Sequence, residues 1–350
     1  MKLLKFLVIV PLLILTSLSS LSFAQKSEDE AGGKFSGYMF GDYYYNIQHH
    51  NPDIKDQNGF WFRRIYFTYD YIIGSGFSTR LRLEMHNNGD YEESKIIIPF
   101  VKDAYLAYGF SKQKAYFGIA PPPTFELIEK IWGYRSVERT PLDEQRMASS
   151  RDFGIGMKGQ FDSKGKFRYH VMIGNSAGTK QDVDKDKSFM ASLSYWVTEG
   201  IVFQIYGDRA ERNGLTNTYI GQAFLGYISD KLHGGLQYSK QVLKTKDTHS
   251  DNINLSVLSF FLTGNIFKKI KLFGRVDRMF EPNPFGGDIA YSPTDTTSSF
   301  FLFIAGIDFQ VVKDVSIMPN IQYVKYDAND EGITPSNDLY ARLTFFWRFK

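Results

Sequence analysis

The residues of this sequence best suited to chemistry are charged side chains that alternate with apolar ones. Segment 77–86 reads FSTRLRLEMH. Its two arginines, Arg80 and Arg82, share one face of an extended chain, and its leucines fall on the other face. A row of positive side chains along one strand attracts anions to that face. We therefore predict that Arg80 and Arg82 form an anion-attracting ladder.

The same alternation directs other charged side chains to one face of their segments. The cations so directed are Arg64, Arg80, Arg82, Lys158, Arg168, Arg275, Arg342 and Arg348. The carboxylates so directed are Asp70, Glu84, Asp103, Asp152, Asp208 and Asp277. Unpaired cations would favour anions, whereas cations paired with these carboxylates would only hold the interior together. The sequence leaves both interpretations open.

Hydrolytic chemistry is the main alternative, because a triad would need a histidine beside a serine and a carboxylate. His86 and His170 share the charged face of their segments, so a Ser or Asp close to either would favour a hydrolase. No G-x-S-x-G, HExxH, P-loop or EF-hand motif occurs, and cysteine is absent. The pair His49 and His50 would either bind a metal or lie solvated in a loop. We expect no enzyme activity and no cofactor.

The strands that we expect to position these residues begin after a predicted secretory leader. Residues 1–24 combine Lys2 and Lys5, an apolar stretch and a small-residue cleavage site ending at Ala24. Without the two leader lysines, 39 basic residues face 38 acidic ones, so net charge gives no case for nucleic-acid binding. Residues 25–350 are then one exported domain, rich in Phe, Tyr and Gly. That composition is typical of a transmembrane β-barrel.

Two-residue alternation predicts sixteen strands in the exported domain. They are 34–45, 60–70, 77–86, 101–110, 113–119, 152–161, 167–174, 188–196, 201–208, 217–227, 231–240, 253–263, 270–279, 299–308, 315–326 and 338–349. The gaps between them alternate between short, polar turns and longer loops, as in outer-membrane barrels. We predict an all-β fold, a transmembrane antiparallel β-barrel of about sixteen strands.

Segment 120–151, the third long loop, is unusually apolar for a surface loop. It carries three prolines and then Phe125, Leu127 and Ile128, followed by Ile131 and Trp132. We predict that it folds inward and constricts the lumen, with an external lid or a trimer contact as alternatives. The residues expected to form the constriction are Phe125, Glu129, Arg135, Glu138, Arg139, Arg146 and Arg151.

This loop resembles the corresponding region of the phosphate-selective porin O and P family. The resemblance rests on the run FELIEKIWGYRSVERTPLDEQRMASSRDFGIGMKG, with its pair Glu138 and Arg139 and its pair Arg151 and Asp152. The stretches FWFRRIYFTYDY and LFGRVDRMFEPNPF agree with it. The resemblance implies a sixteen-stranded, trimeric channel for passive diffusion, whose basic residues attract anions such as phosphate.

The sequence thus predicts a bacterial outer-membrane porin for small hydrophilic solutes. Its expected partners are inorganic anions, outer-membrane lipid and two further copies of the chain, with no nucleic acid. An outer-membrane hydrolase and a structural barrel with a plugged lumen are the alternatives.

Overall fold

The computed structural model describes residues 31–92, 96–183, 185–211, 216–245 and 252–350. The predicted leader, residues 1–24, lies outside these ranges. In the described part of the chain, no helix is long and apolar enough to cross a membrane.

Within the described residues, sixteen strands form one closed antiparallel barrel, and β1 pairs with β16 to close it. The strands are β1 (Gly32–Gln48), β2 (Asn58–Gly74), β3 (Phe77–Met85), β4 (Phe100–Phe110), β5 (Gln113–Ala120), β6 (Asp152–Gln160), β7 (Phe167–Gly174), β8 (Ser188–Trp196), β9 (Ile201–Glu211), β10 (Thr216–Ile228), β11 (Leu232–Thr245), β12 (Ile253–Phe267), β13 (Ile270–Met279), β14 (Phe300–Val312), β15 (Val315–Tyr326) and β16 (Asp338–Phe349). The predicted fold class and strand number are confirmed.

Strand alternation gives the barrel an apolar outer surface. On β14, Phe301 and Phe303 are exposed on the outside, whereas Leu302 and Ile304 are buried inside. Outward Leu81 on β3 is likewise exposed. Apolar side chains are compatible with the hydrocarbon of a membrane. A closed β-barrel can lie there because all its backbone hydrogen bonds form between its own strands.

The connections distinguish the two ends of the barrel. Tight turns such as 75–76 and 313–314 join strands at one end, here called the short-turn end. Longer connections such as 280–299 and 327–337 join strands at the other, the long-loop end. Two of the predicted long loops are shorter than expected, because β9 and β11 continue to Glu211 and Thr245.

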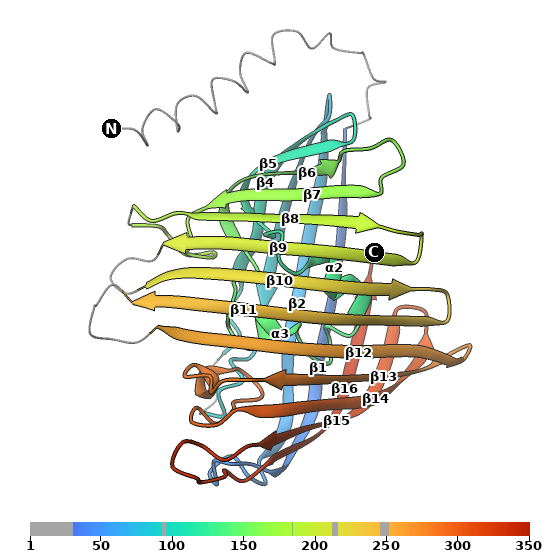
Figure 1. The fold of residues 1–350 in the computed structure, drawn as a ribbon. Coiled ribbons are helices and arrows are strands. Elements are labelled where there is room, and N and C mark those ends of the chain that lie inside the picture. The colour runs from blue at the N-terminus through green and yellow to red at the C-terminus, as the bar shows by residue number, and fades with distance from the viewer. Residues whose placement is uncertain (1–30, 93–95, 184, 212–215, 246–251) are drawn as a thin grey trace.

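The third long loop lies inside the barrel, as predicted. It contains two short helices, α2 (Glu126–Trp132) and α3 (Pro141–Glu144), which Figure 1 shows within the ring of strands. The contacts of α2 are with β10, β11 and β12. Gly226 on β10 makes room for this helix, since a Cβ at that position would lie 2.6 Å from Cδ1 of Ile131.

Candidate functional site

The third long loop divides the lumen into two sides with different inner walls. On β10 to β16 the inner wall carries a large apolar cluster among its polar residues, and the loop packs against this cluster; we call this the covered side. On β1 to β6 the inner wall carries mostly polar and charged residues and faces the loop's charged residues; we call this the open side.

Aromatic packing holds the loop on the covered side. Trp132 meets Phe261 edge to face at 5.3 Å between ring centroids, and Tyr134 stacks on Phe273 at 4.2 Å. Phe125, one of the predicted constriction residues, is buried in the same cluster. Each large apolar side chain buried in this way stabilises the loop by about 1.5–3 kcal/mol. The loop is therefore a fixed part of the barrel interior.

Inward amide side chains satisfy the backbone of the loop. Gln222 on β10 donates to the carbonyl of Thr124 at 3.2 Å, and Gln322 on β15 donates to the carbonyl of Val137 at 3.3 Å. Buried carbonyl groups need such partners, because an unpaired one is costly in a dry interior.

Glu138 is the main ionic anchor of the loop. Its carboxylate accepts two hydrogen bonds of 2.8 Å from Arg63 on β2 and lies 3.5 Å from both Arg139 and Arg342. Burial raises the pKa of Glu138, but the surrounding guanidinium groups outweigh burial and hold that pKa below its usual range. Glu138 therefore stays ionised and ties the loop to β2 and β16.

Arg275 and Arg342 point inward, as alternation predicts, but they are not exposed in the lumen and so do not line the pore as expected for anion-binding residues. The loop covers both, and their side chains are 1% and 0% exposed. Arg275 pairs with Asp277 on its own strand and with Glu144 of α3. Alternation predicts which face a side chain occupies, but it does not predict what will cover that face.

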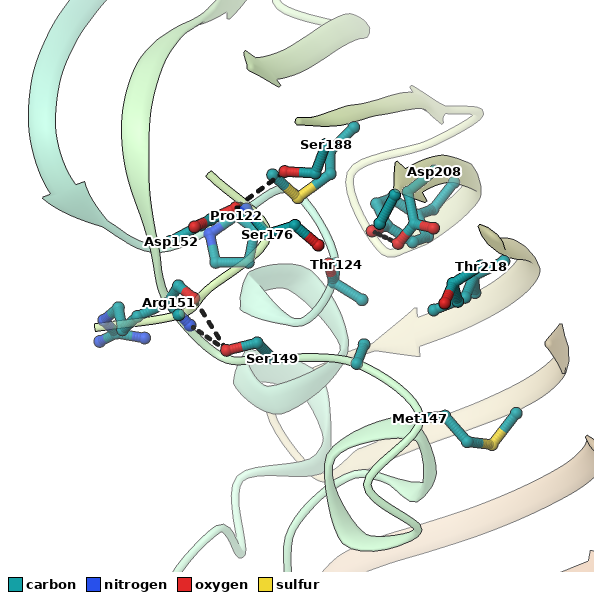
Figure 2. Close-up of a pocket in the computed structure, with 16 residues that line it drawn as sticks. Pro122, Thr124, Met147, Ser149, Arg151, Asp152, Ser176, Ser188, Asp208 and Thr218 are labelled. Carbon is teal, nitrogen blue, oxygen red and sulfur yellow. Dashed lines mark hydrogen bonds between the residues drawn. The ribbon is translucent and has the colours of Figure 1, made fainter. Parts of the chain in front are cut away.

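A small polar cavity remains between the loop and strands β6 to β10. Figure 2 shows Thr124 and Ser149 of the loop facing Ser188, Asp208 and Thr218 of the wall. Its volume of about 40 Å³ is enough for a water molecule or two. A hydrated solute does not fit in this cavity.

Four cations surround two buried carboxylates on the open side. Glu84 lies 2.9 Å from Arg64 and 2.8 Å from Lys102. Asp103 pairs with Arg82 at 3.4 Å and with Arg151 of the loop. We call these six residues the cationic cluster. Its carboxylates are covered by the cations in front of them, so the cations form the surface that meets the lumen.

Further inward cations lie nearer the short-turn end. Arg80 makes a two-pronged ion pair with Asp70, with contacts of 2.7 and 2.9 Å. Lys158 pairs with Glu126 of α2 at 2.8 Å. Arg168 donates to the carbonyl of Gly165 at 2.9 Å and lies over the ring of Trp196. Arg80 and Arg82 thus both point inward, but each has a carboxylate partner.

The remaining predicted loop residues have different surroundings. Arg135 bridges Glu129 at 3.3 Å and Asp143 at 3.4 Å on the face of the loop towards the open side. Arg139 is buried and donates to the carbonyl of Ala290. Arg146 is half exposed and pairs with Asp288 at 3.1 Å.

The sequence prediction did not include three cations that point inward, and two of them do so because of β-bulges. The pairing register shifts beside Arg63 on β2 and beside Lys102 on β4, so these residues point inward together with their neighbours Arg64 and Asp103. A bulge re-aims a side chain in this way. The third, Lys114 on β5, does follow the alternation, and its ammonium lies 5.6 Å from the ring centre of Tyr105.

The histidines considered for hydrolysis have other partners. His170 lies 2.6 Å from the hydroxyl of Tyr116, and Nδ1 of His86 lies 2.9 Å from the carbonyl of Asn87. Among the described residues, neither histidine is hydrogen-bonded to a serine hydroxyl or an aspartate carboxylate. The arrangement expected for a triad is therefore not formed by either residue.

No family model and no curated protein matches this sequence. Solved structures do resemble it. The anion-selective porin from Comamonas acidovorans superposes with a TM-score of 0.67 at 11% identity, covering 91% of this chain and 100% of that one. Salmonella typhi OmpF, in complex with daunomycin, gives a TM-score of 0.62 at 10% identity, covering 91% and 97%.

The trimer form of OmpT, an outer membrane protein of Vibrio cholerae, gives a TM-score of 0.62 at 11% identity. It covers 91% of this chain and 100% of that chain. The fold is that of a porin barrel. At these identities the likeness concerns the fold alone, so the function has to be argued from the lumen.

Proposed function

We propose that this protein is an outer-membrane porin through which small hydrophilic solutes diffuse passively, with a preference for anions. The porin fold and the apolar outer surface support a membrane channel. An exported chain with this outer surface belongs in the outer membrane of a bacterium. The path runs along the open side, between the third long loop and strands β1 to β6.

The exposure of the cationic cluster carries the proposal. The side chains of Arg64, Lys102, Arg82 and Arg151 are 13%, 12%, 16% and 14% exposed, whereas those of Glu84 and Asp103 are 2% and 0% exposed. A solute in the lumen therefore meets ammonium and guanidinium groups before it meets a carboxylate. Four positive charges against two negative ones leave an excess of positive charge at this level.

The position of these charges strengthens the effect of the positive excess on a passing ion. The loop restricts the lumen here, and low-dielectric walls around a narrow, charged passage strengthen its field. On the opposite rim, Arg135 stands between Glu129 and Asp143, which reduces the excess without removing it. The expected result is a moderate anion preference, in a passage that also admits neutral solutes.

Phosphate is a narrower proposal within this one. Arginine side chains bind phosphate oxygens in a two-pronged geometry, and Arg82 of β3 and Arg151 of the loop lie close together because both contact Asp103. If phosphate binds there, adding it to a chloride solution reduces the chloride current at the same voltage. A current unaffected by phosphate would leave a general anion pore.

The main test is the conductance of the purified protein in a planar bilayer, with different KCl concentrations on the two sides. We expect stepwise conductance and a reversal potential of the sign set by chloride. A barrel that does not conduct would favour the structural, plugged alternative. A reversal potential set by potassium would contradict the anion preference.

We also propose that residues 1–24 are removed on export and that the mature barrel is a homotrimer. The trimer is supported by the trimer form recorded for the similar OmpT of Vibrio cholerae. Chemical cross-linking of the detergent-solubilised protein should give a three-chain band. A cross-linked band no larger than one chain would contradict the trimer.

A further inference from the structure

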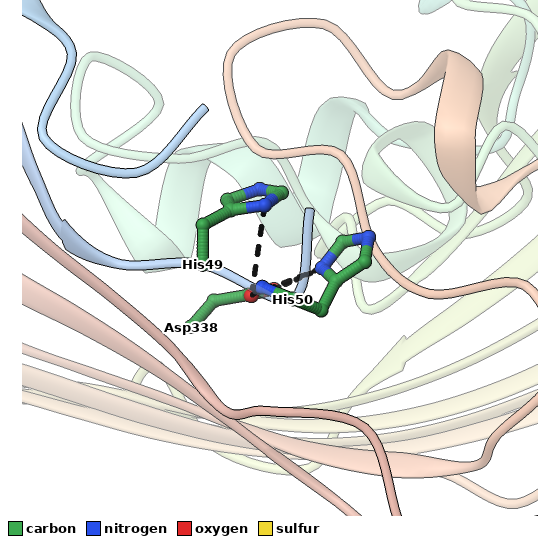
Figure 3. Close-up of side chains that lie close together, drawn as sticks. All are labelled: His49, His50 and Asp338. Carbon is green, nitrogen blue, oxygen red and sulfur yellow. Dashed lines mark hydrogen bonds and ion pairs between the residues drawn. The ribbon is translucent and has the colours of Figure 1, made fainter. Parts of the chain in front are cut away.

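A cluster at the long-loop end brings together two consecutive histidines and a distant aspartate. His49 and His50 follow the end of β1, and Asp338 begins β16. The side chains of His49 and Asp338 are both 0% exposed, and that of His50 is 15% exposed. Figure 3 shows the carboxylate of Asp338 beside both imidazole rings, with a dashed line to each.

The arrangement depends on the chain leaving its extended conformation. Consecutive residues of a strand point to opposite faces, so neighbouring histidines would normally be separated. Here the chain turns after Gln48, and the two rings stack with their centroids 4.3 Å apart. Sequence alone left this pair as either a metal ligand or a solvated loop, because no carboxylate was visible nearby.

We propose that His49, His50 and Asp338 bind a divalent transition-metal ion such as zinc. Imidazole nitrogens and a carboxylate oxygen are the ligands that such ions take, and three protein ligands leave one position for water or a further group. The three ligand atoms all lie within 4.8 Å of one another.

The distances fit a metal with little rearrangement. Nδ1 of His50 lies 3.0 Å from Oδ1 of Asp338, and Nδ1 of His49 lies 3.9 Å from the same oxygen. Bonds of zinc length in a tetrahedral site place two ligand atoms about 3.4 Å apart. Changes of about half an ångström would therefore bring each imidazole nitrogen to this separation from the carboxylate oxygen.

The hydrogen bonds around the cluster show which lone pairs a metal would use. Nδ1 of His49 accepts a hydrogen bond from the backbone N–H of Asn51 at 2.9 Å, so a metal bound at this nitrogen would replace that hydrogen bond. The carboxylate of Asp338 accepts from the backbone N–H of His50 at 2.6 Å and from the hydroxyl of Tyr326. That hydroxyl is also 3.3 Å from Nδ1 of His50, which places it as the nearest candidate for a fourth ligand.

A metal at this site would join the two strands that close the barrel. His50 and Asp338 are 288 residues apart in the sequence and meet only because β1 pairs with β16. The partly exposed ring of His50 gives an ion from outside access to the site. Bound metal would stabilise the folded barrel by an amount that grows with the logarithm of the ratio of its concentration to its dissociation constant.

The test is isothermal titration of ZnCl₂ into the folded, full-length protein without a histidine tag, together with thermal unfolding with and without zinc. We expect one zinc ion per chain and a higher unfolding temperature with zinc. The variants His49→Ala and His50→Ala should each weaken binding by at least about tenfold, the lower bound known for loss of an outer-shell partner. His233→Ala, on β11 and away from the cluster, is the matched control and should bind zinc as the parent does.

Two results would overturn the proposal. One is absence of zinc binding to the folded parent protein, which would leave the cluster as a hydrogen-bonded network only. The other is unchanged binding in the double variant His49→Ala with His50→Ala. Asp338 supports the backbone of His50, so the histidine variants are preferred to Asp338→Asn, and circular dichroism should confirm that each remains folded.

Discussion

Two groups of inward arginines show how one residue type takes two roles in this barrel. On the open side, the side chains of Arg82 and Arg151 are 16% and 14% exposed. Arg275 and Arg342 on the covered side are 1% and 0% exposed. All four pair with carboxylates, yet only the first two can meet a solute.

The difference in exposure between the two groups comes from the apolar residues of the wall and not from the arginines themselves. Phe224, Phe261 and Phe273 line the covered side and bury Trp132 and its neighbours, which draws the loop across that wall. The loop does not enclose Arg82 and Arg151 in this way, and their side chains remain partly exposed. The covered arginines therefore hold the loop, and the open ones are those that we propose to act on permeating ions.

The largest effect is expected from Glu138→Gln in the third long loop. This change removes the charge that compensates Arg63 and Arg342, both fully enclosed. Loss of one partner of a buried ion pair costs about 3–5 kcal/mol. We expect a lower thermal unfolding midpoint and, where the loop detaches, a larger single-channel conductance.

The matched control is Glu129→Gln, which changes a partly exposed carboxylate of the same loop. It should leave the unfolding midpoint nearly unchanged, because exposed ion pairs contribute little. Equal destabilisation by the two changes would remove the distinction between covered and open charges.

The next effect concerns ion selectivity and tests the open side. In the double variant Arg82→Gln with Lys102→Gln, the two remaining cations of the cluster only balance Glu84 and Asp103. The reversal potential in a KCl gradient should move towards the potassium value. Arg209→Gln with Lys325→Gln removes the same charge from the outer face and should leave the potential as in the parent.

A smaller effect of opposite sign is expected from Glu84→Gln. Arg64 and Lys102 would then face the lumen without their shared carboxylate, so the positive excess would grow. The reversal potential should move further towards the chloride value, while Glu211→Gln serves as an exposed control outside the cluster. A shift towards potassium would show that Glu84 is not shielded by these cations.

The smallest effect is a pH dependence of stability at the seam between β1 and β16. Burial lowers the pKa of His49 from about 6.5 to about 4. The carboxylate of Asp338 raises this pKa and the neighbouring His50 lowers it, but burial has the largest effect. The unfolded chain takes up a proton at this residue between those values, whereas the folded chain does not. Stability should therefore fall as the pH decreases from about 6.5 to about 4.

The measurement is the thermal unfolding midpoint across this pH range, without added metal. His49→Asn removes the titrating group and should flatten that part of the profile. An identical profile in the variant would place the pH dependence at another residue.

Much of the fold could be predicted from the sequence, because a barrel wall repeats one simple physical rule. Each strand alternates between lipid and lumen, so segments such as FSTRLRLEMH specify both the strand and its orientation. The inward position of the third long loop also followed from its own residues, since Trp132 and Ile131 need a dry partner.

The site was less predictable for two physical reasons. Bulges at Arg63 and Lys102 each insert one extra residue and break the alternation locally. The residue types at these positions do not indicate a bulge. The exposure of Arg275 and Arg342 depends on a loop that is distant in sequence. Likewise, the partner of His49 and His50 could not be found before β1 and β16 were known to meet.

The central claim is that the lumen favours anions because its open side exposes cations and covers its carboxylates. The most direct measurement is the reversal potential of the parent protein in a planar bilayer with different KCl concentrations on the two sides. We predict a potential displaced towards the chloride equilibrium value. A potential displaced towards the potassium value would contradict the account.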